Sequence, residues 1–162
     1  NIGLMNDYNN RDTFVKNGSS TVDLVNGKYQ VQDFVTCYHP DGETPPQFRY
    51  SRNLMLDFNV KFGYRLLEEK YVVDHTIAND DDIVSVDNVI KPKQWKQVID
   101  AYAEELGKRA LIADVPFMQK SIQVGLSTVS PDRLETSFSY KRTGIARIAS
   151  TSVVAGFNFG TL

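Results

Sequence analysis

The clearest secondary-structure pattern in the chain is the stretch PKQWKQVIDAYAEELGK, which covers residues 92–108. Pro92 suits the first turn of a helix, because its ring fixes φ and the N–H group that it lacks would be unpaired there. The apolar side chains that follow are spaced by three, one, three and four residues and therefore share one face of a helix. We predict an amphipathic helix over 92–108 whose core-facing residues are Trp95, Val98, Ile99, Tyr102 and Leu106.

The stretch upstream of this helix, residues 54–66, fits two structures. Its even positions are apolar and most of its odd positions are polar, which is typical of a half-buried strand. Four of its residues, at 55, 58, 62 and 66, also form a helical stripe, and the following Glu68-Glu69-Lys70 favours a helix. The pattern alone leaves both interpretations open.

The remaining patterns predict one short helix and several strands. We expect the first ten residues to form a loop and a helix to run from Asn10, as its cap, to Gly18. Asn26-Gly27 separates two β-prone runs, 21–25 and 28–38, and this dipeptide is typical of a tight hairpin turn. A loop at 40–46, an acidic loop at 79–82 and a short helical turn after Asp114 follow. We expect late strands at 121–129, 134–140 and 145–159, joined by turns at 130–132 and 141–144. Together these elements predict an α+β fold with a small, mainly antiparallel sheet.

The final strand-like run is long, nearly uncharged and apolar. An open strand of this kind aggregates unless a partner covers it. We therefore expect a partner to cover this run. The residues of the run that we expect to take part are Ile148, Ser150, Ser152, Val153, Val154, Ala155, Phe157 and Phe159.

Length and composition limit the class of protein. With 162 residues, 23% charged residues and 11% aromatic residues, the chain is expected to form one soluble domain over 1–162 rather than a disordered segment. No apolar run approaches the ~18 residues of a membrane span, so we expect no membrane insertion. The single cysteine excludes an internal disulfide and a thiolate-rich metal site.

The residues that could carry chemistry are few. Cys37 and His39 fall on the same face of a predicted strand, but no third group that would orient them is implied. His39 and His75 each lie near carboxylates, yet their spacing enforces no metal site, and Asp80-Asp81-Asp82 lacks the pattern of a calcium loop. We therefore expect no enzymatic activity, no metal and no cofactor.

The charge is distributed unevenly along the chain. Residues 115–162 carry a net charge of +3, whereas residues 1–114 carry −5, and the total is −2. A basic late region could meet an acidic protein surface or a nucleic acid, and the charge pattern leaves both partners open. The basic residues concerned are Lys120, Arg133, Lys141, Arg142 and Arg147.

Several segments of the chain are informative when they are taken in order. They are YQVQDFVT at 29–36, RYSR at 49–52, DFNV at 57–60, NVIKPKQW at 88–95, RALIAD at 109–114, SIQV at 121–124, RLETSFSYK at 133–141, GIARI at 144–148 and AGFNFG at 155–160. In this order they resemble the carboxy-terminal part of tail sheath proteins from contractile-tailed bacteriophages. The similarity spans roughly residues 18–160, and the order of the segments carries it rather than any single motif.

The resemblance implies a structural subunit. Sheath proteins of this kind polymerise as stacked hexameric rings around an inner tail tube, and their carboxy-terminal domain faces the tube. The implied partners are neighbouring sheath subunits, the inner tail tube protein, and the baseplate and tail terminator proteins; no nucleic acid is expected. The sheath is assembled in the host cytoplasm and belongs to the virion, where its contraction drives the tube through the host envelope for genome ejection.

The resemblance also sharpens the structural expectations. It favours a long helix over about 51–71, which decides between the two interpretations of that stretch. It implies that residues 145–162 form an inter-subunit arm, which adds the strand described above to a neighbouring subunit. It also implies that the basic late residues face the tube. Because sheath proteins are several times longer, we expect this chain to be a carboxy-terminal fragment of one. A related contractile device, of the bacteriocin or secretion type, and a nucleic-acid-binding module remain alternatives.

Overall fold

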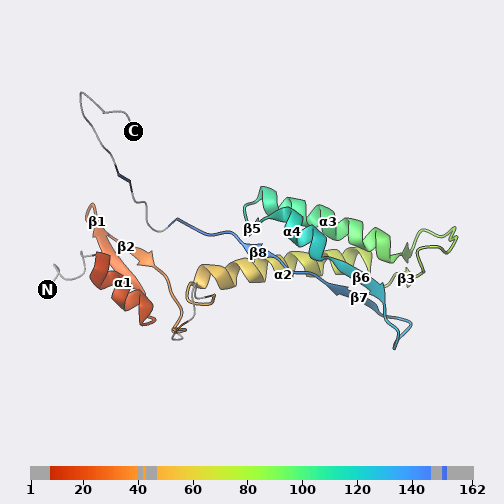
Figure 1. Cartoon of the computed structure of the whole chain (residues 1–162), viewed down its shortest axis with the longest axis horizontal. Helices are drawn as coiled ribbons and strands as arrows, with labels where there is room; N and C mark the ends of the chain where they lie inside the picture. The colour runs from red at the N-terminus through yellow and green to blue at the C-terminus, as the bar shows by residue number, and fades with distance from the viewer. Residues whose placement is uncertain (1–7, 40–41, 43–46, 147–150, 153–162) are drawn as a thin grey trace, which may run out of the picture.

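The structure is a computed structural model, and it describes residues 8–39, 42, 47–146 and 151–152 of the chain. The molecule is elongated: two long antiparallel helices lie side by side along its length, and a helix with a β-hairpin lies at one end (Figure 1). Over the described residues there are four helices and eight short strands, and the strands pair in four two-stranded sheets. The α+β class is therefore confirmed.

The two main helices have the predicted bounds. They are α2 (Ser51–Tyr71) and α3 (Pro92–Lys108), and they are accompanied by the shorter α1 (Tyr8–Lys16) and α4 (Val115–Ser121). Pro92 opens α3 as expected, and the side chain of Gln94 accepts a hydrogen bond of 3.2 Å from the backbone N–H of Lys91. The start of α1 differs from the prediction: the helix begins at Tyr8, inside the stretch that we expected to be a loop.

The first strand, β1 (Thr21–Val25), has the predicted bounds, whereas the strands predicted at 28–38, 121–129 and 134–140 are shorter than predicted. Three antiparallel pairs join β1 (Thr21–Val25) to β2 (Lys28–Asp33), β5 (Ile112–Ala113) to β8 (Lys141–Arg142) and β6 (Gln123–Leu126) to β7 (Leu134–Ser137). A parallel pair joins β3 (Thr76–Ile77) to β4 (Val89–Ile90). The expected turn at 141–144 is wrong in its first half, because Lys141 and Arg142 pair with Ala113 and Ile112 as strand β8.

The first hairpin is the one that the Asn-Gly dipeptide predicted. Asn26 and Gly27 both have positive φ values, 51° and 76°, as a two-residue turn of this type requires. The second strand ends at Asp33 rather than at Tyr38, and a single bridge between Val35 and Tyr50 then leads the chain into α2. Cys37 and His39 therefore do not lie on a strand, which is contrary to our prediction.

The core forms between α3 and the elements that surround it. Of the five predicted core residues, Trp95, Ile99 and Leu106 are buried, and Val98 and Tyr102 pack against them half-buried. Helix α2 contributes Leu56 and Val60, and α4 contributes Met118. The pattern did not identify Ala103, which is fully buried, because a methyl side chain contributes little to an apolar face.

Close contact between the two long helices depends on a glycine. A methyl group at Gly63 of α2 would lie 2.5 Å from the hydroxyl oxygen of Tyr102 on α3. Tyr102 donates a hydrogen bond of 2.8 Å to the carbonyl oxygen of Val60, one turn earlier on α2. The missing side chain of Gly63 thus lets Tyr102 reach the backbone of α2.

The ring of Trp95 joins α3 to α2 and to β7. Its indole N–H donates a hydrogen bond of 3.0 Å to the hydroxyl of Thr136. The ring of Tyr64 lies 5.9 Å from that of Trp95 and 5.2 Å from that of Phe138, measured between centroids. Burial in this cluster raises the pKa of Tyr64 to about 12.

Candidate assembly surfaces

The root of the predicted terminal arm is tied to α2 by an ion pair. Arg142 of β8 donates two hydrogen bonds to the carboxylate of Asp57, from Nε at 2.8 Å and from Nη2 at 2.6 Å, and Tyr140 donates a third of 2.7 Å. One residue further on, the carbonyl oxygen of Thr143 accepts a hydrogen bond of 2.9 Å from Arg52 of α2. These contacts fix the point at which the chain leaves the folded body.

The same contacts shift the acid–base properties of the three side chains. The hydrogen bond from Arg142 holds the pKa of Asp57 below its usual value. Burial, together with the neighbouring carboxylate, raises the pKa of Tyr140. The hydrogen bond to Asp57 raises the pKa of Arg142. Both members of the ion pair therefore stay charged at neutral pH.

Beyond this root, the described residues lie away from the body. Ile145 is 59% exposed, and 146, 151 and 152 are also exposed and belong to no strand. Ser152 is the only one of the eight residues predicted for the inter-subunit strand that the structure describes. The others, Ile148, Ser150, Val153, Val154, Ala155, Phe157 and Phe159, lie outside the described residues.

The predicted basic surface is neutralised in part by the protein itself. Arg142 is paired with Asp57, and Lys141 donates to the carboxylate of Asp114 at the start of α4. Lys120 and Arg133 are exposed and form no ion pair within the described ranges. Arg147 lies outside them. Lys120 and Arg133 are therefore the predicted basic residues that the structure shows exposed and without an ion pair.

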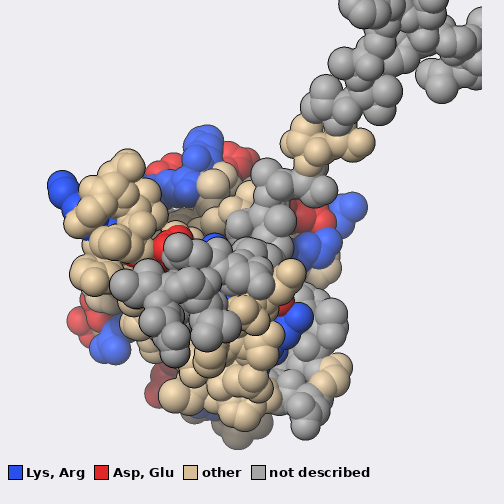
Figure 2. Space-filling model, turned by 90° about the vertical axis from the view of Figure 1, so that its left-hand side faces the viewer, with Lys and Arg blue, Asp and Glu red and all other residues tan. Residues whose placement is uncertain are grey.

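The first hairpin carries an exposed apolar face. Its register places Val22 opposite Val31 and Leu24 opposite Tyr29, so that the four side chains share one side of the β1–β2 pair. They are between 44% and 80% exposed. The opposite side faces α1, where Arg11 forms an ion pair of 2.8 Å with Asp23. Figure 2 views this end of the molecule, where uncharged residues cover much of the described surface and charged residues form small groups between them.

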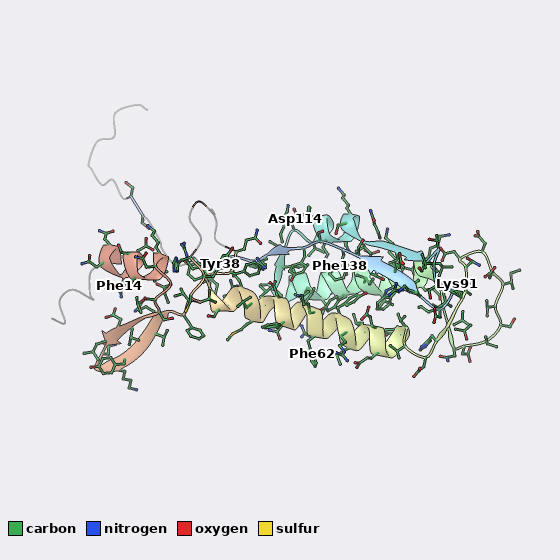
Figure 3. All side chains as sticks on the ribbon, turned by 90° about the horizontal axis from the view of Figure 1, so that it is seen from below. Phe14, Tyr38, Phe62, Lys91, Asp114 and Phe138 are labelled. Carbon is green, nitrogen blue, oxygen red and sulfur yellow. The ribbon has the colours of Figure 1, made fainter. Side chains whose placement is uncertain are left out.

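A second exposed apolar surface runs along the outer side of α2. It consists of Met55, Phe58, Phe62 and Leu66, each between 49% and 66% exposed, and we name it the α2 row. Figure 3 shows Phe62 on the side of α2 that faces away from the other helices. Beside the row, a groove of about 530 Å³ lies between α2 and the end of α3, lined among others by Gly63, Tyr102 and Arg109. The sequence pattern identified this stripe, but it did not show that the stripe faces outward.

A third exposed surface is the loop between β3 and β4. It comprises residues 79–88, of which the sequence pattern predicted 79–82, and we use the name acidic loop for the whole of it. It carries four aspartates and the apolar residues Ile83, Val84 and Val86, which are 100%, 38% and 67% exposed. Sequence analysis identified its acidic residues but not its apolar ones. The sequence contained an indication of this surface, because Ile83, Val84 and Val86 are three β-branched apolar residues within four positions, which is unusual for a loop exposed to solvent.

The residues considered for chemistry are not brought together. Cys37 and His39 are exposed, and the ring of His75 contacts a backbone oxygen of its own loop, that of Val73. Within the described ranges, no three His, Cys, Asp or Glu side chains converge in a way that would hold a metal ion. None of the helices in the described part of the chain combines the length and the apolar composition that a membrane span requires.

Two comparisons with known proteins bear on the identity of the chain. A scan against protein-family models finds none that matches this chain, and a search of curated proteins finds no match either.

Proposed function

We propose that this chain is the tube-facing, ring-linking domain of a contractile tail sheath protein. In this role it polymerises with other copies as stacked hexameric rings around an inner tail tube. Contraction of the sheath then drives the tube through the host envelope. The order of the segments that resemble sheath proteins motivates the proposal, and the exposed surfaces of the structure support it.

The observation that carries the proposal is how the chain continues after β8. Asp57, Arg142 and Arg52 hold the chain up to Thr143, and the next described residues, 144–146, are exposed and belong to no strand. A firmly anchored root followed by a long apolar, β-prone sequence is what strand addition to a neighbour requires. The two-stranded sheets could serve as acceptors, because an isolated pair of strands leaves hydrogen-bonding groups free on both edges.

The remaining basic residues bear on the contact with the tube. Lys120 and Arg133, exposed on α4 and before β7, are the positions through which an acidic tube surface would be contacted. The ion pairs of Lys141 and Arg142 reduce the support for a nucleic-acid-binding module, since less free positive charge remains for phosphates. A bacteriocin or secretion-type sheath would use the same surfaces and is the alternative within this proposal.

Deletion of residues 152–162 tests the terminal strand. We expect the full chain, alone or with its inner tube protein, to form rings or tubes that are visible by negative-stain electron microscopy. The deletion should abolish them, because the donated strand is removed. The thermal transition followed by circular dichroism should change little, because the core residues that the structure describes lie between Leu56 and Tyr140. The control is Val129→Ser, which removes an 89% exposed apolar side chain from the turn between β6 and β7 and should assemble normally.

Two outcomes would contradict the proposal in different ways. Normal tubes from the truncated chain would show that the terminal strand does not link subunits. Failure of the full chain to form rings or tubes, even on its inner tube protein, would remove the sheath function itself.

A further inference from the structure

We propose that the α2 row of one copy receives the acidic loop of a second copy. This contact is separate from the terminal-strand exchange and does not depend on it. It would join copies head to tail through side chains of the folded body.

The α2 row is built as a docking surface rather than as part of the core. Its four residues are spaced by three, four and four positions, so they form one line about 16 Å long at 1.5 Å per residue. The core side of the same helix is occupied by Leu56 and Val60, which are 4% and 1% exposed. One apolar side of α2 is therefore buried in the core, and the other, the α2 row, is available for contact with another molecule.

The acidic loop presents its apolar residues on a fixed base. Lys91 Nζ donates to the carbonyl oxygens of Asp80 and Asp82, and Asp80 accepts a hydrogen bond of 2.9 Å from the backbone N–H of Lys93. The carboxylate of Asp82 accepts one of 2.8 Å from the backbone N–H of Asn79. Because these contacts order the first part of the loop, residues 79–82, before binding, less conformational entropy is lost when the neighbouring Ile83 is buried by a partner.

The two surfaces have complementary charges. Lys61 and Arg65 lie on α2 beside the row, and both are exposed. Arg65 forms a 3.1 Å ion pair with Glu69, but both side chains are more than half exposed, so that little free energy is lost if the pair rearranges. In the acidic loop, Asp81 and Asp87 flank the apolar residues and form no ion pair among the described residues.

The geometry favours a head-to-tail contact over a two-fold one. The acidic loop projects from the end of the molecule near Lys91, whereas Phe62 lies midway along the outer side of α2 (Figure 3). A two-fold pairing of α2 rows, centred between Phe58 and Phe62, would bring the Lys61 side chains of both copies together. A contact between loop and row avoids this repulsion and leaves each copy with one free loop and one free row, so that rings or filaments grow.

Sedimentation velocity on the full chain at low ionic strength tests the contact. We expect concentration-dependent self-association that weakens about tenfold in Phe62→Ser and in Ile83→Ser, since each truncates a central apolar contact. Val73→Ser, at a 49% exposed position just beyond α2, is the matched control and should behave like the unmodified chain. All three positions are exposed, and circular dichroism verifies that each variant folds.

A charge exchange identifies the partners. Reversing Lys61 and Arg65 to Glu in one chain, and Asp81 and Asp87 to Lys in another, should weaken self-association of each, whereas a mixture of both should associate again. A chain that stays monomeric at every concentration would overturn the proposal, as would a mixture that fails to recover. If Phe62→Ser weakens self-association and Ile83→Ser does not, the α2 row binds something other than the acidic loop, and the proposal is wrong. If deletion of residues 153–162 then abolishes self-association, the terminal segment is what the row binds.

Discussion

The hairpin end of the molecule and its helical body use apolar residues differently. In the body, α3 contributes Trp95 and Ile99 to a core that α2, α4 and β7 cover. At the hairpin end, Val15 of α1 is fully buried, but the apolar side chains on the outer face of β1–β2 are at least 44% exposed. Among the described residues, the body therefore encloses an apolar core beside its exposed α2 row, whereas the outer face of the hairpin is left without an apolar cover.

The largest expected difference between the two regions comes from removing one aromatic ring from each. Trp95→Ala should lower the free energy of unfolding by about 3–5 kcal/mol, because it leaves a cavity in the core and an unpaired hydroxyl on Thr136. Tyr29→Ala, at an 80% exposed position of the hairpin, should change it by less than about 0.5 kcal/mol. Urea unfolding measures both losses. Circular dichroism is the suitable signal, because Trp95 is the only tryptophan and its replacement removes tryptophan fluorescence. Equal losses would show that the hairpin face is already part of a core.

An intermediate effect is expected at the ion pair that holds β8 to α2. The folded protein lowers the pKa of Asp57, so its carboxylate stabilises the fold above the ordinary value of about 3.9. That contribution is lost as the pH falls through the lowered pKa. Asp57→Asn should therefore cost about 2 kcal/mol at pH 7 and flatten the decline in stability below about pH 4.

Urea unfolding as a function of pH measures this effect. Arg142→Lys is the matched comparison, because it keeps the charge but loses the two-point contact, and it should give a smaller loss than Asp57→Asn. Identical pH profiles for the unmodified chain and Asp57→Asn would show that the pair does not contribute to stability.

The smallest effect is expected at the hairpin turn, and it should stay local. Gly27→Ala forces a side chain into a positive φ of 76°, which costs about 1 kcal/mol. Amide hydrogen exchange in β1 and β2 should accelerate about fivefold, while the slowest amides of α3 keep their rates. Gly125→Ala in β6 is the control, since its φ is not positive and a methyl group there meets no atom within 4 Å. Acceleration in α3 as well would mean that the two regions unfold together.

Sequence patterns predicted the elements whose apolar period is strong. Helix α3 was predicted with its bounds because a proline, one apolar face and a charged opposite face all agree. The Asn26-Gly27 turn was predicted because few dipeptides accept two positive φ values. By contrast, residues 54–66 stayed ambiguous: a helix that is apolar on both its core side and its outer side also has apolar residues at alternate positions.

The features that sequence reasoning missed depend on contacts between distant segments. Strand β8 pairs with residues about 30 positions earlier, and nothing in Lys141-Arg142 itself indicates that partner. The internal neutralisation of Arg142 was missed for the same reason, since Asp57 is 85 positions away. The exposed apolar residues of the acidic loop could have been noticed from composition, but their exposure follows from the contacts of Lys91, which hold the base of the loop.

The anchoring of β8 also determines how the domain carries mechanical load. A pull on the chain beyond Thr143 is resisted by the hydrogen bond from Arg52, by the Arg142–Asp57 pair and by the pairing of β8 with β5. Tension is therefore shared between α2, the longest helix of the body, and β5, whose Ile112 belongs to the apolar core. The contacts to α2 involve charged side chains, and they can re-form after a pull has broken them.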